Sequence, residues 1–275
     1  MNTATTPLIA PLAEHDLAEA FQLSCAAGWN QTASDWRMLF RLAPDGCFAL
    51  HADGKLVATT SLLCYEGRLG WIGMVLTHAD YRRRGFARAL LEHVLTHADA
   101  QRIATLKLDA TEQGQPLYER LGFTAEQPVE RWSRPGNSEL PATDQRGQLP
   151  EACLTINREA FGIDRSTLLG DLSKRSAIFT SENAFIFRRP GLNAEYVGPF
   201  VSRNTDDARA LLIHCMQSAG EAACFWDLLP KNTAAVDLAR DLGFVRHREL
   251  VRMARGAAYA GRDALTWGIA GFELG

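Results

Sequence analysis

The chain has 275 residues, of which 47% are hydrophobic and 22% charged, as in an ordinary folded globular protein. Its length exceeds the usual size of one compact core and predicts two domains. The formal net charge of −3 argues against a dedicated nucleic-acid binder, which usually carries a basic excess. No run of residues approaches the roughly 20 apolar residues that a membrane-spanning helix needs.

The cysteines and the first residues bear on the compartment. The six cysteines are scattered and form no CxxC pair: Cys25, Cys47, Cys64, Cys153, Cys215 and Cys224. This spacing predicts neither a disulfide framework nor a metal site, and it favours buried apolar thiols in a reducing compartment. The first residues lack the basic segment and apolar run of a secretory signal. We therefore expect a cytoplasmic protein without a bound metal.

Hydrophobic periodicity in the first half predicts helices and strands in alternation. The expected helices are at about 14–27, from about 32 onward, at 85–98 and at 116–121, and the expected strands at 47–50, 56–63, 68–76, 104–110 and 123–132. Asp53-Gly54, between the first two strands, is a strong hairpin signal. Residues 133–150 contain three prolines and two glycines, the composition of a linker.

The second half repeats the first in outline. The expected strands are at 177–179, 184–188, 195–201 and 222–228, and the expected helices at 205–219 and 233–242. LYERLGF at 117–123 and LARDLGF at 238–244 each follow a strand that contains an aspartate, Asp109 or Asp227. The shared order predicts an internal duplication. We divide the chain into an N-terminal domain (1–134), a linker (135–150) and a C-terminal domain (151–275).

The segment from Met74 to Leu95 has the features of an anion site. A buried strand ends, a polar turn follows, and Arg82-Arg83-Arg84-Gly85-Phe86-Ala87 opens an amphipathic helix. The first N–H groups of a helix lack intrahelical partners, and the helix dipole adds positive potential there. Small Gly85 and Ala87 let a phosphate approach the backbone, and the arginines add charged donors. The alternative is a solvated surface turn.

The ordered motifs around this turn resemble the GNAT N-acetyltransferase superfamily. Arg82-x-x-Gly85-x-Ala87 is similar to its pyrophosphate-binding signature, and Leu108–Thr111 and Pro116–Phe123 look like its later strand and helix. The superfamily resemblance covers about residues 5–132. Further similarities point to a bacterial subgroup with a second, degenerate acetyltransferase-like domain: Gly28-Trp29-Asn30-Gln31, Asp35-Trp36, Trp71–Val75 and Tyr196-Val197-Gly198-Pro199. The resemblance implies an α/β (α+β) fold of two tandem GNAT-like domains, each a mixed, mostly antiparallel sheet flanked by helices.

The resemblance also implies a cofactor site for acetyl-CoA as co-substrate. The pantetheine arm would pair with the backbone of three consecutive strand residues, Met74, Val75 and Leu76. The pyrophosphate would bind at the turn and the helix start, formed by Arg82, Arg83, Arg84, Gly85, Phe86, Ala87 and Arg88. Tyr118 would lie near the thioester sulfur as a general acid, unless it is a packing tyrosine. The base is open between Asp109, Glu112 and water, and Asp109 can equally pair with an arginine.

Acceptor residues are expected in two places. Trp29, Asn30 and Trp36 lie in the segment that often walls the acceptor site in this superfamily, with core packing as the alternative. In the second half, two aspartates occupy the corresponding helix start, where they would repel a pyrophosphate. The C-terminal half is therefore predicted to lack a cofactor site and to shape the acceptor pocket, in which Asp227 either lines the pocket or belongs to the core.

These features together predict an enzyme that acetylates a primary amine of a small molecule by direct attack on acetyl-CoA. A protein acetyltransferase acting on an N-terminus or a lysine is the second hypothesis, and a non-catalytic acyl-CoA-binding regulatory protein is the third. The expected partner is a small-molecule amine, with no nucleic acid and no membrane, and the chain is expected to be a monomer or a homodimer.

Overall fold

The computed structural model describes residues 7–136, 149–259 and 261–275, so most of the linker predicted at 135–150 lies outside the described residues. The N-terminal half contains β1 (Leu8–Pro11), η1 (Glu14–Asp16), α1 (Leu17–Ala26), α2 (Ala33–Leu42), β2 (Cys47–Ala52), β3 (Lys55–Tyr65), β4 (Leu69–Thr77), η2 (Ala79–Tyr81), α3 (Phe86–Ala100), β5 (Thr105–Ala110), α4 (Gln115–Arg120) and β6 (Thr124–Arg134). These positions confirm the elements predicted for this half.

The C-terminal half contains α5 (Glu151–Phe161), α6 (Ser166–Ser173), β7 (Ala177–Thr180), β8 (Ala184–Arg189), β9 (Glu195–Ser202), α7 (Thr205–Ala219), β10 (Cys224–Leu228), α8 (Thr233–Asp241), β11 (Val245–Gly256), η3 (Asp263–Leu265) and β12 (Thr266–Gly268). The predicted strands and helices between residues 177 and 242 are present. The periodicity of the sequence does not predict α5, α6, β11 or β12.

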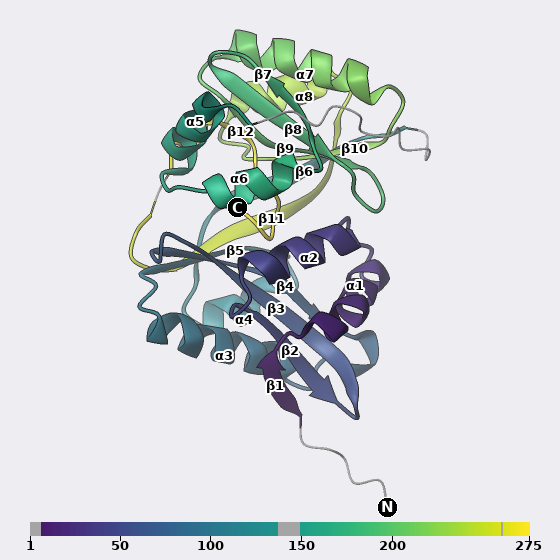
Figure 1. Ribbon diagram of the computed structural model, residues 1–275, viewed down its shortest axis with the longest axis vertical. Coiled ribbons are helices and arrows are strands. Elements are labelled where there is room, and N and C mark those ends of the chain that lie inside the picture. Colours follow the sequence, from purple (N-terminus) through teal and green to yellow (C-terminus); the bar gives the residue numbers. More distant parts are fainter. Residues whose placement is uncertain (1–6, 137–148, 260) are drawn as a thin grey trace, which may run out of the picture.

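The two halves share one mixed, mostly antiparallel sheet with helices packed against it (Figure 1). Its strand order is β1-β2-β3-β4-β5-β11-β6-β10-β9-β8-β7, and β12 pairs with β9 outside this path. α1 and α2 lie on one side of the N-terminal strands and α3 on the other, while α7 and α8 cover the far end of the C-terminal half. The predicted α/β class with mostly antiparallel sheets is confirmed.

The junction of the halves is built by strand exchange. β11 of the C-terminal half lies between β5 and β6, and β6 of the N-terminal half lies between β10 and β11. From one edge of the sheet, β1 to β5 follow in chain order, and β11 of the other half lies between β5 and β6. From the opposite edge, β7 to β10 follow in chain order, and β6 of the other half lies between β10 and β11. This pseudo-symmetry is what an internal duplication predicts. Since each half completes the other's sheet, the halves form one body, and the domain limits drawn from composition stay a prediction.

Two buried ion pairs occupy equivalent places at this junction. Arg131 on β6 pairs with Asp227 on β10 through two contacts of 2.7 Å. Arg252 on β11 pairs with Asp109 on β5 at 2.9 and 3.0 Å. Both carboxylates are fully buried. Removing one partner of such a pair typically costs about 3–5 kcal/mol, because the other charge stays buried without a counter-charge.

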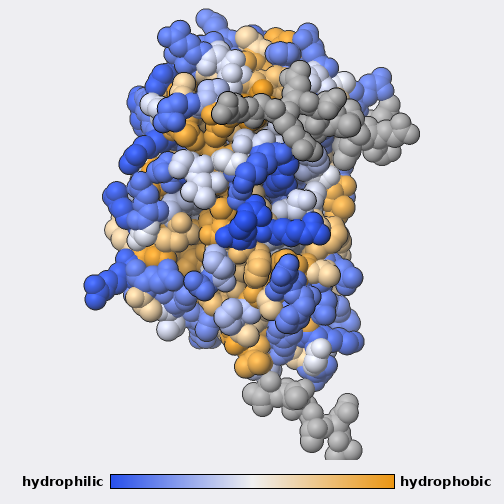
Figure 2. Space-filling view, in the orientation of Figure 1, coloured by the Kyte–Doolittle hydropathy of each residue, from blue (hydrophilic) through white to orange (hydrophobic). Residues whose placement is uncertain are grey.

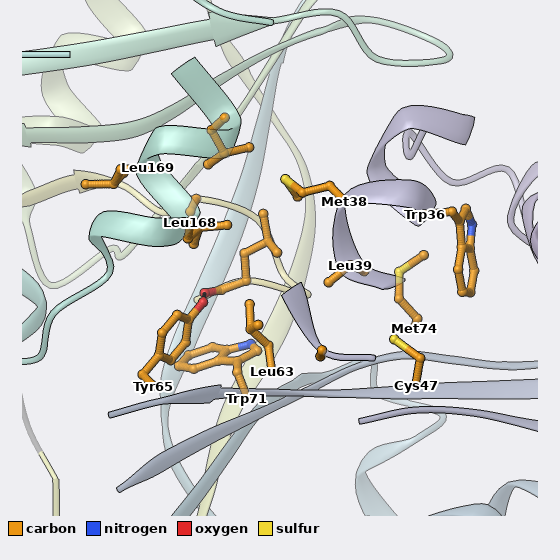
Figure 3. Close-up of a cluster of buried hydrophobic side chains, with 14 of the residues drawn as sticks. Trp36, Met38, Leu39, Cys47, Leu63, Tyr65, Trp71, Met74, Leu168 and Leu169 are labelled. Atoms are coloured by element: carbon orange, nitrogen blue, oxygen red, sulfur yellow. Dashed lines mark hydrogen bonds between the residues drawn. The ribbon is translucent and has the colours of Figure 1, made fainter. Parts of the chain in front are cut away.

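The largest apolar cluster crosses the junction. Figure 3 shows Met38 and Leu39 of α2 and Leu168 of α6 in the same cluster as Tyr65 and Trp71 of the sheet. Burial of each large apolar side chain contributes about 1.5–3 kcal/mol. This cluster therefore fixes α6 of the C-terminal half over the strands that carry the candidate site.

On the face shown in Figure 2, hydrophilic side chains alternate with apolar ones, and apolar residues reach the surface near the junction of the halves. Within the described ranges, no helix has both the length and the apolar character needed to cross a membrane.

Candidate active site

The centre of the site is a bulge in β4. Between two regular pairs of β3 and β4, Thr60 alone faces both Met74 and Val75, and Met74 has a φ of 50°. The hydroxyl of buried Thr59 donates to the Met74 carbonyl at 2.8 Å, and that of Thr60 donates to the Gly73 carbonyl at 3.4 Å. A bulge leaves backbone groups unpaired and turns them out of the ladder. The two threonines hold the distorted strand in place.

β4 separates from its neighbour β5 before it reaches the bulge. Parallel pairing with β5 covers only Leu69–Trp71 against Thr105–Lys107, although both strands continue. The edge of β4 from residue 72 to 77 therefore faces a cavity of about 670 Å³ instead of a strand. An open strand edge can pair with an extended ligand that carries amide groups.

This cavity brings together most of the residues predicted for the cofactor. Its lining includes Met74, Val75, Leu76, Arg82, Arg83, Gly85, Phe86, Ala87 and Arg88. Arg84 is not part of the lining, because its guanidinium lies over the ring of Tyr81, 4.7 Å from the ring centre. The turn and the strand edge, which the sequence placed in one site, thus form two parts of one cavity.

The start of α3 has the geometry of an anion site. Gly85 is the N-cap, with a φ of 83° and no capping side chain. The first backbone bond of the helix runs from Ala89 N–H to the Gly85 carbonyl. The N–H groups of Phe86, Ala87 and Arg88 precede it and have no intrahelical acceptor. Together with the helix dipole, these N–H groups favour a bound phosphate.

Tyr118 projects from α4 into the same cavity. It is 8% exposed, and its ring packs edge-on against Phe123. Burial raises the pKa of the Tyr118 phenol above its ordinary value, so the hydroxyl keeps its proton at neutral pH. No partner within the described residues hydrogen-bonds this hydroxyl. It is thus a proton donor available to a ligand.

The two acidic candidates for the base lie differently. Asp109 lines the cavity, but both of its oxygens accept from Arg252, which favours the arginine-pairing alternative. Glu112 is exposed and outside the cavity lining. Neither arrangement resembles a free carboxylate beside a reacting amine.

The structure places the residues predicted for the acceptor site in different surroundings. Trp29 lines the cavity. Asn30 is buried, and its amide bonds Ala194 N–H and the Ala194 carbonyl, each at 3.0 Å, so that it links the halves. Trp36 is 1% exposed and donates to the Ser24 hydroxyl. For Trp36, and for Asp227 in its pair with Arg131, these contacts favour the core-packing alternative.

Residues that the sequence did not indicate complete the cavity wall. They are Gln31, Arg248 and Leu250 of β11, and Phe272 and Glu273 of the last segment. Glu273 is 4% exposed and accepts from the Gln31 amide at 2.8 Å. Burial, and to a lesser degree the nearby Asp35 carboxylate, raise the pKa of Glu273. Gln31 comes with its neighbour Trp29, but only the exchange of β11 and the path of the last segment bring the other four residues here, so no local pattern signals those four.

The equivalent place in the C-terminal half is filled by the chain itself. β9 and β10 pair only from Glu195 to Val197, and β12 then pairs with β9 at Phe200 and Val201. The Trp226 indole donates to the Trp267 carbonyl at 2.9 Å. These contacts, made inside the split between the strands, favour the prediction that this half holds no cofactor.

The helix starts of the two halves also differ. In α7 the Asn204 side chain accepts from Asp207 N–H at 2.8 Å, and acidic side chains occupy the first turn. In α3 no side chain caps the helix. A capped, acidic helix start disfavours a phosphate, whereas an uncapped one favours it.

We expect Thr59→Val to lower the free energy of unfolding by about 1–3 kcal/mol, because the Met74 carbonyl loses its donor inside the protein. Thr60→Val is the matched control: its longer bond to Gly73 predicts a smaller loss. Urea unfolding of both variants measures the difference. An equal or larger loss for Thr60→Val would show that the Thr59 bond does not hold the bulge.

Comparison with known proteins identifies the fold of both halves. The sequence model of the GNAT acetyltransferase family matches residues 13–123, and a second GNAT acetyltransferase domain model matches residues 153–268. An uncharacterized N-acetyltransferase of Bacillus subtilis, YitH, is 26% identical over 254 residues, which cover 86% of this chain and 88% of the relative.

Solved structures agree in fold. A protein from Pyrococcus horikoshii, provisionally described as an acetyltransferase, superposes with a TM-score of 0.85 at 19% identity, over 98% of this chain and 96% of that one. A GCN5-related N-acetyltransferase from Sphaerobacter thermophilus gives a TM-score of 0.61 at 14% identity, over 97% and 98% of the two chains. At these identities the likeness concerns the fold alone.

The two domain models together cover most of the sequence. Each matches one half of the chain, in agreement with the pseudo-symmetry of the sheet. The chain therefore belongs to the GNAT family of acetyltransferases, as an acyltransferase with two tandem GNAT domains.

Proposed function

We propose that this acetyltransferase binds acetyl-CoA in the cavity along β4 and transfers the acetyl group to a primary amine of a small molecule. One observation carries the proposal: a single cavity joins an uncapped helix start, an open strand edge and a buried, protonated tyrosine. These are an anion site, a site for amide groups and an acid, in the order in which a nucleotide-tailed thioester presents the matching groups.

The residues present fit coenzyme A. The N–H groups of Phe86, Ala87 and Arg88 suit the pyrophosphate, and Arg82 and Arg83 in the lining add positive charge. The edge of β4 from Met74 to Leu76 suits the pantetheine amides, which would extend the sheet like a short strand. The thioester then lies beside Tyr118.

The proposed reaction is direct attack of the amine nitrogen on the thioester carbonyl. A nitrogen–carbon bond forms, the carbon–sulfur bond breaks, the leaving thiolate takes the proton of Tyr118, and the proton lost by the nitrogen restores the phenol. A backbone N–H in the segment Met74–Leu76 would polarise the carbonyl oxygen. Holding both reactants in one cavity supplies much of the rate by orientation.

In this proposal the two halves of the chain have different roles in binding the cofactor and the acceptor. The N-terminal half supplies the cofactor surface and Tyr118, while the C-terminal half closes the acceptor end with β11 and the last segment. The wall at that end includes Trp29, Leu250 and Phe272. A cavity of about 670 Å³ has the size of a small-molecule site, which favours a small molecule over a folded protein as acceptor. A measurement of thiol release from acetyl-CoA with a panel of amines and peptides tests this proposal, which fails if no acceptor is acetylated.

Titration calorimetry is expected to give one acetyl-CoA per chain. The split between β9 and β10 is already occupied by β12, and α7 begins with a capped, acidic turn. A stoichiometry of two would show that the C-terminal half keeps a working cofactor site.

A further inference from the structure

The acceptor end of the cavity contains a cation, Arg248, that forms no ion pair with any residue the structure describes. Arg248 lines the cavity beside a bulge in β11, and its buried Nε has no hydrogen-bond partner. The carboxylates on the neighbouring strands already form ion pairs with other arginines. Asp227 pairs with Arg131, and both Glu130 and Glu249 pair with Arg246. Burial and the neighbouring Arg131 lower the pKa of Arg248, and the Asp227 carboxylate, which is already paired with Arg131, offsets them only in part.

The same end contains a buried carboxylate, that of Glu273, which forms no ion pair with the described residues. Glu273 lines the cavity and is buried, with the neutral Gln31 amide as its side-chain donor. The nearby arginines are engaged elsewhere: Arg189 donates to the carbonyls of Gly198 and Ala270, and Arg175 pairs with Asp35. The nearby charge of Arg189 lowers the pKa of Glu273, but no ion pair joins Glu273 to a cation within the described residues.

Glu273 lies directly beside the bulge of β4. A Cβ added at Gly73 would lie 2.7 Å from the Glu273 Cβ, so the last segment packs against the strand one residue before Met74. The chain is held there by Trp71, whose indole donates to the Phe272 carbonyl at 2.9 Å. The backbone and Cβ of Glu273 are therefore fixed at the part of β4 where the thioester is proposed to lie, and the carboxylate extends from there to the Gln31 amide.

A buried charge without a partner is costly, and a ligand that brings the opposite charge recovers this cost. Arg248 and Glu273 offer one charge of each sign in one cavity, yet no ion pair joins them. A guanidinium suits a carboxylate through two parallel hydrogen bonds, and a carboxylate suits an ammonium group. The two side chains together match a molecule that carries an amine and a carboxylate.

We propose that the acceptor is an amine that also bears a carboxylate, such as an amino acid, with its carboxylate on Arg248 and its amine on Glu273. This inference rests on the proposed function. Glu273 takes a proton from the ammonium group, and the neutral amine attacks the thioester carbonyl carbon. The carbon–sulfur bond breaks, the thiolate takes the Tyr118 proton, and the second proton lost by nitrogen restores the phenol. The proton on Glu273 passes to solvent, so one proton is released per turnover.

Matched acceptors test the proposal. We compare kcat/KM for amino acids and for the amines that differ only by loss of the carboxylate, for example phenylalanine and phenethylamine. The carboxylate should raise kcat/KM of the accepted pair at least about tenfold, since a charged hydrogen bond contributes about 1.5–3 kcal/mol. Arg248→Met should reduce this ratio to about one, and Arg248→Lys should keep part of it. Arg246→Met, on the same strand but paired with Glu130 and Glu249, should leave the ratio unchanged.

The two proposals fail in different ways. Equal turnover of acceptors with and without a carboxylate by the wild-type protein overturns this inference, whether or not the variants fold, as does a ratio that survives Arg248→Met. Either result would still be compatible with the proposed function, the transfer of an acetyl group to an amine. Failure to acetylate any amine overturns the proposed function instead. Glu273→Gln should lower kcat by about 100-fold with acetyl-CoA affinity retained, in the usual range for loss of a general base. Unchanged kcat would remove Glu273 from the reaction.

Discussion

Tyr118→Phe is expected to lower kcat for acetyl transfer by about 100-fold or more, the usual contribution of a general acid. The buried phenol keeps its proton, because burial raises its pKa, and no other residue within the described chain bonds the hydroxyl. The ring packs against Phe123 and remains in the variant, so acetyl-CoA affinity should change little. Steady-state kinetics with saturating acceptor, together with calorimetric titration of acetyl-CoA, measure the two effects separately.

Tyr81→Phe is the matched control for this prediction. Tyr81 also lines the cavity, but it lies at the anion turn, where its hydroxyl contacts Asp53 at 3.3 Å. Loss of that hydroxyl should leave kcat nearly unchanged. A Tyr118→Phe protein that turns over like Tyr81→Phe would contradict the assignment of the acid.

Gly85→Ala is expected to weaken acetyl-CoA binding by at least about tenfold, which corresponds to about 1.4 kcal/mol. The glycine has a φ of 83°, where a side chain is strained, and its N–H neighbours are the proposed phosphate donors. A Cβ there meets no protein atom within 4 Å, so the space it would fill is the space proposed for the phosphate. Calorimetry measures the affinity, and thermal unfolding measures the strain.

Gly54→Ala separates backbone strain from loss of the phosphate site. Gly54 has a φ of 73°, has open space around its Cβ position, and lies in the β2–β3 hairpin turn outside the cavity lining. Its replacement should destabilise the protein by a similar amount while acetyl-CoA affinity stays unchanged. If Gly54→Ala weakens binding as much as Gly85→Ala does, strain alone explains the loss and the phosphate site is not at Gly85.

The parts of the site that the sequence predicted are those built from neighbours along the chain. The strand ending at Thr77, the turn at Arg82–Ala87 and the helix after it form one continuous segment, and periodicity and helix-start chemistry identify such a segment directly. Tyr118 follows from its own short helix. Apart from Arg84, the structure places these residues in the lining of one cavity.

The other parts depend on contacts between distant segments. β11 takes its place between β5 and β6 through pairings such as Val251 with Ala110, which no local pattern specifies. The same exchange gives Asp109 and Asp227 their arginine partners, so carboxylates that look available in the sequence are occupied in the fold. It also delivers Arg248 to the cavity. Pairing between distant strands therefore determines which residues line the acceptor end of the cavity, and the periodicity of the sequence does not reveal such pairing.

Burial decided the open alternatives for the tryptophans. Trp29 and Trp36 lie seven positions apart in a segment that the sequence could assign either to the acceptor wall or to the core. The structure exposes Trp29 to the cavity and buries Trp36 against Ser24. Trp29 lies in the connection between α1 and α2, and Trp36 lies on α2; which of the two meets the cavity is set by the elements packed around them, which the sequence of this segment alone does not contain.

A crystal structure of the protein with bound acetyl-CoA tests the central claim most directly. We predict the pyrophosphate at the N–H groups of Phe86, Ala87 and Arg88, the pantetheine amides along Met74–Leu76, and the thioester sulfur within hydrogen-bonding reach of the Tyr118 hydroxyl. Acetyl-CoA bound elsewhere on the molecule, or a turn at Arg82–Ala87 that stays empty at saturating acetyl-CoA, would contradict the account.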